Sequence, residues 1–124
     1  MMNDGKPHLL IVDDEADMRD ELCSYFSDQG YRVTAAATGK EGSSTYDQDT
    51  ADAVITDIRM PSGDGHQLIE RLKSENSDLP IVVITGHDTF INKSTFVNDS
   101  RITVLKKPVG LREIEAALQS VLKA

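Results

Sequence analysis

The sequence predicts an α/β fold in which a five-stranded parallel sheet is covered by helices on both faces. Five short runs rich in Val, Ile and Leu alternate along the chain with segments whose apolar residues recur at helical spacing. The runs lack strict apolar–polar alternation, which is typical of strands covered on both faces. Turn signals with Gly or Pro keep the connections short, and right-handed crossovers then make neighbouring strands parallel. A single domain is expected for 124 residues.

The expected strands are residues 8–12, 31–36, 53–56, 81–85 and 102–105. Three of the intervening or following segments have clear helical spacing. The residues that carry it are Met18, Leu22, Tyr25 and Phe26 in the first helix, Leu68, Ile69 and Leu72 in the third, and Leu111, Ile114, Leu118, Val121 and Leu122 in the last. In sheets of this kind ligands bind at the carboxyl ends of the strands, so functional residues are expected there.

Two further helical segments have poor intrinsic helix propensity. Residues 39–48 contain two glycines, two serines and a threonine, and Tyr46 is their only large apolar side chain. Packing is therefore expected to stabilise this helix. Residues 88–99 are mediocre helix formers throughout, so a fourth helix there is expected to be short, frayed or mobile.

Composition excludes several classes of protein. The formal net charge of -8 argues against direct binding to nucleic acid, which depends on clustered Lys and Arg. The single cysteine, Cys23, cannot form an internal disulfide and is expected to be a buried structural thiol. Residues 1–7 are polar and do not resemble a signal peptide, and no apolar run approaches the length of a membrane span. A cytoplasmic location is expected, with no membrane partner.

Acidic residues follow two of the predicted strands. Asp13, Asp14 and Glu15 come after the first strand and Asp57 after the third, so at least three carboxylates are expected at one edge of the sheet. The carboxylates of such a cluster repel one another and favour a hard divalent cation, and Mg²⁺ is the expected ion. Taken alone, the first three acids are equally well explained as the cap and acidic first turn of a helix.

The remaining strand ends favour the chemical interpretation. The fourth strand ends in Thr85-Gly86, and the fifth leads into Lys106-Lys107-Pro108. A carboxylate nucleophile, a metal, a hydroxyl and an ammonium group are what phosphoryl transfer requires. The sequence therefore predicts a site that handles a phosphoryl group.

Four motifs, in this order and at the ends of these strands, resemble those of response-regulator receiver domains of two-component signal transduction. They are residues 11–15, Asp57 with Met60-Pro61 and Gly65, Thr85-Gly86, and Lys107-Pro108. The resemblance covers essentially the whole chain and is closest to receivers of the chemotaxis type. It implies a doubly wound, flavodoxin-like three-layer sandwich with strand order 2-1-3-4-5. It also implies that residues 1–124 form one receiver domain, with any output domain absent from this chain.

The resemblance implies a role for each residue of the acidic cluster. Asp57 is the expected phospho-acceptor, Asp14 a direct metal ligand, and Asp13 a ligand acting largely through water. The backbone carbonyl of Arg59 is the remaining expected protein ligand. Mg²⁺ is the implied cofactor, with Mn²⁺ as a substitute.

The other matched residues are expected to handle the phosphoryl group. Lys107 holds one phosphoryl oxygen, and the hydroxyl of Thr85 moves onto another. Gly86 leaves the approach to the acceptor open, and the peptide bond between Lys107 and Pro108 is expected to be cis. Lys106 is expected to point away as a solvated charge.

The implied function is a bacterial signalling switch rather than an enzyme acting on other substrates. A sensor histidine kinase or a phosphotransfer protein is the expected phosphoryl donor. The face built from the fourth helix, the fifth strand and the fifth helix is expected to regulate a downstream protein or a fused output domain. A phosphorylation-dependent homodimer is a further expectation.

One position departs from the pattern of the family, and two others correspond to family positions that affect the rate of dephosphorylation. Val104 occupies a position on the fifth strand where many receivers carry an aromatic residue, so the fourth helix itself is expected to report phosphorylation. Arg59 and His87 correspond to positions that flank the entrance and influence the dephosphorylation rate. Structural roles are expected for His8 and His66.

Other functions fit the residues less well. A phosphatase of the haloacid dehalogenase type needs a cap domain, and a Toprim-like site needs an Asp-x-Asp motif where Asp57 is followed by Ile58 and Arg59. An FMN-binding protein needs a loop rich in glycine and hydroxyl groups where this chain has three acids. The alternative that remains is a receiver-like interaction module that signals without phosphorylation.

Overall fold

The computed structural model describes residues 6–57, 65–86 and 101–123. Its helices and strands alternate in the predicted order. They are β1 (His8–Val12), α1 (Ala16–Asp28), β2 (Arg32–Ala36), α2 (Gly39–Gln48), β3 (Ala53–Asp57), α3 (Gly65–Glu75), β4 (Ile81–Thr85), β5 (Ile102–Lys106) and α5 (Leu111–Lys123). The predicted fourth helix, at residues 88–99, lies outside the described residues.

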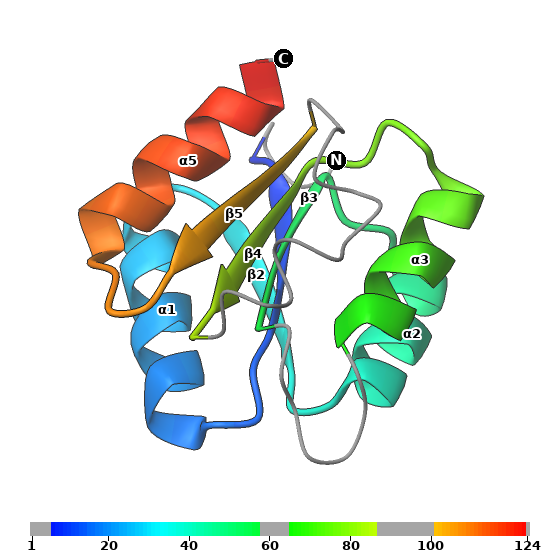
Figure 1. Ribbon diagram of the computed structural model, residues 1–124, viewed down its shortest axis with the longest axis horizontal. Helices are drawn as coiled ribbons and strands as arrows, with labels where there is room; N and C mark the ends of the chain where they lie inside the picture. The colour runs from blue at the N-terminus through cyan, green and yellow to red at the C-terminus, as the bar shows by residue number, and fades with distance from the viewer. Residues whose placement is uncertain (1–5, 58–64, 87–100, 124) are drawn as a thin grey trace.

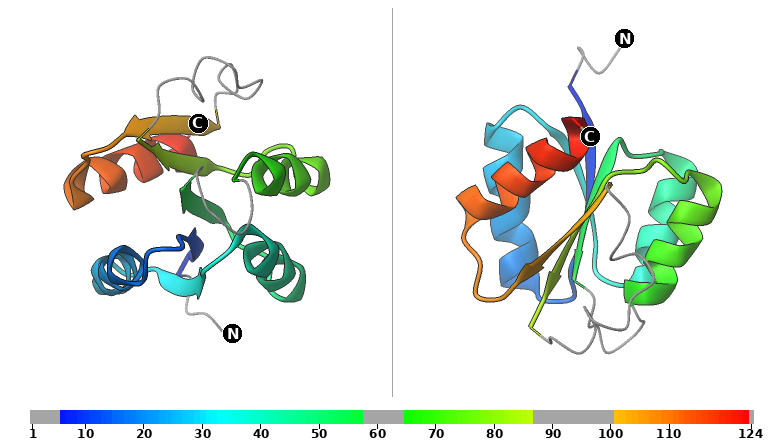
Figure 2. Two further views of the ribbon diagram at one scale, coloured as in Figure 1. Left: turned by 60° about the horizontal axis from the view of Figure 1, so that its bottom comes forward. Right: turned by 45° about the horizontal axis from the view of Figure 1, so that its top comes forward.

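The sheet confirms the predicted α/β fold. All neighbouring strands are parallel and their order is β2-β1-β3-β4-β5. Helices α1 and α5 cover one face of the sheet, and α2 and α3 cover the other (Figures 1 and 2). No helix of the described ranges is both long and apolar enough to span a membrane.

Each face of the sheet has its own apolar core, which explains why the strands are almost continuously apolar. In β1, Leu9 and Ile11 face the core beneath α1 and α5, whereas Leu10 and Val12 face the core beneath α2 and α3. All four side chains are at most 1% exposed. Burying one such side chain contributes about 1.5–3 kcal/mol, so β1 is fixed firmly at the centre of the sheet.

Helix α2 has the predicted bounds, and both packing and capping compensate for its composition. Tyr46 is 4% exposed in the core beneath α2 and α3. Thr38 is the N-cap, and its hydroxyl accepts a 3.0 Å hydrogen bond from the amide of Glu41. The Glu41 carboxylate in turn accepts a 2.6 Å bond from the amide of Ala37. The first of these bonds satisfies an amide that the first helical turn leaves unpaired, and the second fixes the residue that precedes the cap.

Strand β2 begins one residue later than predicted, because Tyr31 completes the end of α1. Gly30 adopts a φ of 100°, and the amide of Tyr31 donates a 3.1 Å hydrogen bond to the carbonyl of Phe26. The rings of Phe26 and Tyr31 also meet edge to face, with centroids 5.6 Å apart. This combination is a Schellman motif with its apolar contact. Strands β3 and β5 instead extend one residue further than predicted, to Asp57 and Lys106.

Candidate functional site

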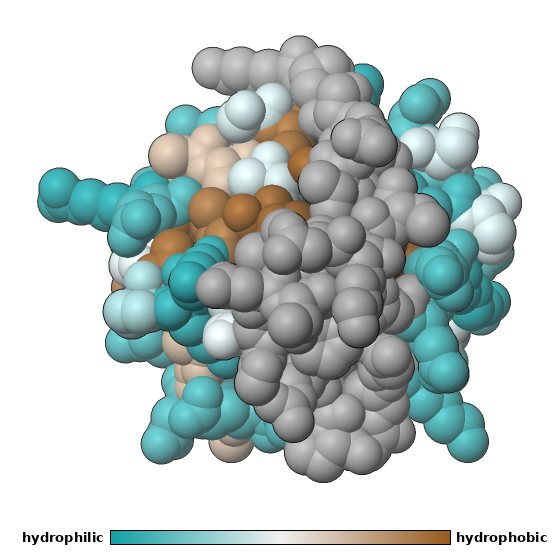
Figure 3. Space-filling view, viewed as in Figure 1, coloured by the Kyte–Doolittle hydropathy of each residue, from teal (hydrophilic) through white to brown (hydrophobic). Residues whose placement is uncertain are grey.

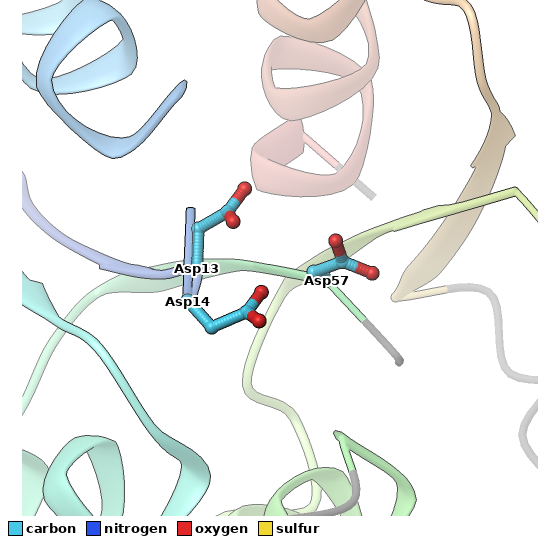
Figure 4. A group of neighbouring side chains, drawn as sticks. All are labelled: Asp13, Asp14 and Asp57. Carbon is cyan, nitrogen blue, oxygen red and sulfur yellow. The ribbon is translucent and has the colours of Figure 1, made fainter. Parts of the chain in front are cut away.

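Parallel pairing of β1 with β3 brings three carboxylates together. The register aligns Val12 with Thr56, so the residues that follow them, Asp13 and Asp57, reach the same edge. Oxygen atoms of Asp13, Asp14 and Asp57 all lie within 4.8 Å of one another. Figure 4 shows the Asp13 and Asp14 carboxylates on the side that faces Asp57. The cluster predicted from the sequence is therefore present in the structure.

Asp13 is held firmly and is 3% exposed. Its amide donates a 3.1 Å hydrogen bond to the carbonyl of Ala36 at the end of β2. One carboxylate oxygen accepts a 2.9 Å bond from the amide of Glu15. Burial raises the pKa of this carboxyl, and the charges of Asp57 and Asp14 raise it further, while the Glu15 amide and Lys107 lower it. The net direction is upward, so the ionised form of Asp13 is disfavoured where it stands.

The alternative that these acids only cap helix α1 is supported in one respect. Glu15 is the N-cap residue, but its side chain makes no capping hydrogen bond. Asp13 serves the turn by accepting the Glu15 amide, yet its carboxylate also belongs to the acidic cluster. Asp14 is exposed and takes part in that cluster. A local structural role for Asp13 thus coexists with the cluster.

Lys107 lies directly against Asp57. Its Nζ is 2.8 Å from Oδ2 of Asp57, which is 6% exposed at the end of β3. Burial lowers the pKa of Lys107, but the hydrogen bond and charge of Asp57, with the charges of Asp13 and Glu15, raise it overall. The ammonium is therefore held in its charged form beside the carboxylate. The Lys107–Pro108 peptide bond is cis, as expected.

Thr85 ends β4 next to this pair of charges and is fully buried. Its carbonyl accepts a 2.8 Å hydrogen bond from the amide of Lys107, which ties the end of β4 to the loop after β5. Gly86 is exposed, and a Cβ built there would meet no atom of the described residues within 4 Å. A small side chain at this position would thus meet none of the described residues, and the expectation that Gly86 keeps the approach to Asp57 open stays a prediction.

Several predicted residues are placed elsewhere or lie outside the description. Arg59, Met60, Pro61 and His87 lie outside the described residues, as does the proposed reporter helix. Lys106 is exposed on β5, as expected. His8 is buried at the opposite end of the sheet, where its ring contacts the Thr50 carbonyl and the Thr34 hydroxyl. Its predicted structural role is confirmed by these contacts.

The structure also reveals features that the sequence analysis did not single out. Arg19, in the first turns of α1, donates a 2.8 Å hydrogen bond from Nη1 to the backbone carbonyl of Asp13. A pocket of about 420 Å³ adjoins the acidic cluster, and it is lined by Glu15, Met18, Lys107, Pro108 and Val109. An arginine six residues after an aspartate does not by itself predict a hydrogen bond between them, so this contact could be found only in the folded structure.

Comparison with known proteins identifies similar sequences and structures. A family model described as the response regulator receiver domain matches residues 9–119. The chain is 34% identical over 121 residues to a probable transcriptional regulator, ycf27, of Cyanidium caldarium, covering 98% of this chain and 48% of that protein. It is 34% identical over 119 residues to the response regulator SaeR of Staphylococcus aureus, covering 93% of this chain and 50% of that protein.

Among solved structures, the chemotaxis response regulator CheY4 of Vibrio cholerae aligns with a TM-score of 0.81 and 26% identity. That alignment covers 94% of this chain and 98% of the other. The chain therefore spans about half the length of the curated relatives above, but nearly all of this solved structure.

Proposed function

Because the chain belongs to the response regulator receiver domain family, we propose that it is a signalling switch in which Asp57 accepts a phosphoryl group. The contact that carries the proposal is the 2.8 Å approach of Lys107 Nζ to Asp57 Oδ2, at the edge where Asp13 and Asp14 add two further carboxylates. A structural ion pair alone would not need two additional acids, whose mutual repulsion is unfavourable.

The donor atoms fit a hard divalent cation. Asp13, Asp14 and Asp57 offer carboxylate oxygens within 4.8 Å of one another, and Mg²⁺ prefers such oxygens together with water. Mg²⁺ is the proposed ion, with Mn²⁺ as a substitute, and the carbonyl of Arg59 is a further proposed ligand. The bound ion would neutralise negative charge on the acids and on the incoming phosphoryl group.

The proposed reaction is an in-line displacement at phosphorus. An oxygen of Asp57 attacks the phosphorus of a donor phosphohistidine, so that a P–O bond forms, the P–N bond breaks, and the imidazole leaves with the electron pair. Lys107 moves from the Asp57 carboxylate to a phosphoryl oxygen, which retains its charge pairing. The hydroxyl of Thr85 donates to another oxygen. The product is an acyl phosphate on Asp57.

The phosphoryl group would act by shifting a population. It favours whichever conformation binds it better, through the new contacts of Thr85 and Lys107. Hydrogen bonds to charged groups contribute roughly 1.5–3 kcal/mol each, so two of them shift an equilibrium by a factor on the order of a hundred or more. Helix four, β5 and α5 are the proposed output face, and Figure 3 shows apolar surface in the region of β5 and α5.

The proposed partners follow from the family. A sensor histidine kinase or phosphotransfer protein supplies the phosphoryl group in the cytoplasm, and a downstream protein or fused output domain receives the signal. A phosphorylated homodimer is a further proposal. Because the relatives above are about twice as long as the aligned region, a fused output domain outside residues 1–124 is part of the proposal. Catalysis by this domain is limited to its own phosphorylation and dephosphorylation.

The proposal is tested by intact-protein mass spectrometry after incubation with acetyl phosphate, with and without Mg²⁺. The wild type should gain one phosphoryl group only with Mg²⁺, and Asp57→Asn should gain none. Asp28→Asn, which changes an exposed acid in the last turn of α1, should behave as the wild type. Absence of the mass gain in wild type that binds Mg²⁺ would instead support a module that signals without phosphorylation.

A further inference from the structure

Arg19 connects helix α1 to the backbone of the acidic cluster. Its Nη1 lies 2.8 Å from the carbonyl oxygen of Asp13, six residues earlier in the chain. The backbone amide of Arg19 donates separately to the carbonyl of Glu15, at 2.9 Å, which is an ordinary bond of the first helical turn. The side chain therefore provides a donor to a carbonyl that precedes the helix and lies outside its ladder of hydrogen bonds.

The carbonyl that Arg19 binds belongs to the peptide joining Asp13 to Asp14. The atoms of a peptide, including both flanking Cα atoms, lie close to one plane. A hydrogen bond to the carbonyl oxygen consequently restrains the orientation of that plane. The plane in turn determines where the side chains of Asp13 and Asp14 begin, and thus the direction in which both carboxylates project.

Asp14 has greatest need of this restraint. Two hydrogen bonds hold Asp13: its backbone amide donates to the carbonyl of Ala36, and its carboxylate accepts from the amide of Glu15. Asp14 is exposed, and within the described part of the chain its carboxylate has no hydrogen bond or ion pair. Its position in the cluster therefore depends on the backbone that carries it.

We propose that Arg19 is a positioning residue for the divalent-metal site, acting through the Asp13–Asp14 peptide rather than by contact with the ion. The inference rests on the proposed metal-dependent function and adds to it a residue that determines metal affinity. Arg19 is suited to this role because its planar guanidinium presents donors in a fixed geometry, and because a charged donor makes a stronger bond to a carbonyl than a neutral one.

The sign of the effect separates positioning from simple charge. Arg19 carries a positive charge near an acidic site, so removing that charge alone would strengthen the binding of a cation. Loss of positioning would weaken binding instead. Partners that orient metal ligands typically change affinity by about 10- to 100-fold when removed, and the lower end is expected here because Arg19 holds backbone rather than a ligand atom.

The test is Mg²⁺ titration by calorimetry of the wild type, Arg19→Gln and Arg19→Lys. The control is Arg71→Gln, which removes the same charge from α3, where Arg71 pairs with Asp47 of α2. Arg19→Gln should raise the dissociation constant about tenfold. Arg19→Lys, whose ammonium can still donate to the carbonyl, should raise it about threefold. Arg71→Gln should bind as the wild type does.

A second measurement does not depend on the metal. Without Mg²⁺, hydrogen exchange at the amide of Glu15, which donates to the Asp13 carboxylate, should become faster in Arg19→Gln but not in Arg71→Gln. Melting temperatures record any general loss of stability. Unchanged or tighter Mg²⁺ binding by Arg19→Gln would overturn the inference. If that variant does not fold, Arg19→Ala, which also removes the donor, takes its place, and unchanged or tighter Mg²⁺ binding by it would overturn the inference. A wild type that binds no Mg²⁺ would refute the proposed function itself.

Discussion

Polar groups are buried at both ends of the sheet, but at one end donors and acceptors are matched, whereas at the other end like charges lie together. At the amino end of β1, His8 is 1% exposed and each ring nitrogen has a partner. Nδ1 lies 3.0 Å from the carbonyl of Thr50, so it is assigned as the donor. Nε2 then accepts from the Thr34 hydroxyl at 2.7 Å. The backbone of His8 also exchanges hydrogen bonds with Asp52.

At the carboxyl end, like charges are brought together instead. Three carboxylates lie within 4.8 Å of one another, and Lys107 is within hydrogen-bond distance of Asp57. Burial and two neighbouring acids raise the pKa of Asp13. Local interactions at this end leave negative charge in excess, which is unfavourable unless a cation is bound.

The difference separates a structural polar group from a functional one. A buried group whose donors and acceptors are matched stabilises the fold, and changing it should reduce stability without affecting chemistry. Changing a buried group that lies among like charges should instead affect the chemistry without reducing stability.

Replacing His8 by Ala should destabilise the fold by about 3 kcal/mol, since it opens a cavity and leaves buried partners unpaired. Urea unfolding measures this loss, and calorimetry should show Mg²⁺ binding unchanged. A large loss of Mg²⁺ affinity in the folded variant would contradict the separation of the two ends of the sheet.

Replacing Lys107 by Met should slow phosphorylation by acetyl phosphate about 10- to 100-fold, because one charge-assisted hydrogen bond to the phosphoryl group is lost. The rate is measured from the time course of the mass gain. Lys106→Met, an exposed neighbour on β5, serves as the control and should remain near the wild-type rate. Equal slowing in both variants would argue against a specific role for Lys107.

Replacing Asp13 by Asn should stabilise the metal-free protein at pH 7 by on the order of 1 kcal/mol, the usual size of a single-site effect. The pKa of Asp13 is raised by folding, so the native state binds its proton more tightly than the unfolded chain. Wild-type stability from this group is present at acid pH and lost as pH rises through the folded pKa. Urea unfolding with EDTA should thus show a gain that shrinks toward acid pH, and a loss at pH 7 would contradict it.

Replacing Asp49 by Asn should produce the smallest effect, with the opposite dependence on pH. The hydrogen bond from Arg32 lowers the pKa of Asp49 below its ordinary value of 3.8. Its stabilising contribution is therefore present above that value and lost as pH falls through the lowered pKa. Melting temperatures of wild type and variant should differ slightly at pH 7 and converge in acid. The carboxylate is about half exposed, which limits the effect.

Local patterns were sufficient to predict most of the elements. Buried strands and amphipathic helices have distinct apolar periodicities, so β1, β4 and α2 have the bounds that the sequence predicts. The predictions were wrong or incomplete at helix ends, where capping residues form hydrogen bonds with the backbone groups of the first or last turn. Tyr31 completes the cap of α1 instead of starting β2. The Thr38–Glu41 cap of α2 has a spacing that is recognisable in the sequence, but it was not predicted. Cys23, expected to be buried, is half-buried against the core beneath α1 and α5.

The α/β class and the candidate acids, hydroxyl and lysine were predictable from the sequence, because strand periodicity and the residues that follow each strand are local properties of the chain. The contacts among these groups, in contrast, follow from the way the chain packs in three dimensions. The 2.8 Å contact between Asp57 and Lys107 joins residues 50 positions apart. The contact of Arg19 with Asp13 depends on the orientation of α1 relative to the end of β1. Distances of this kind depend on the packing of strands and helices, which no single segment of sequence encodes.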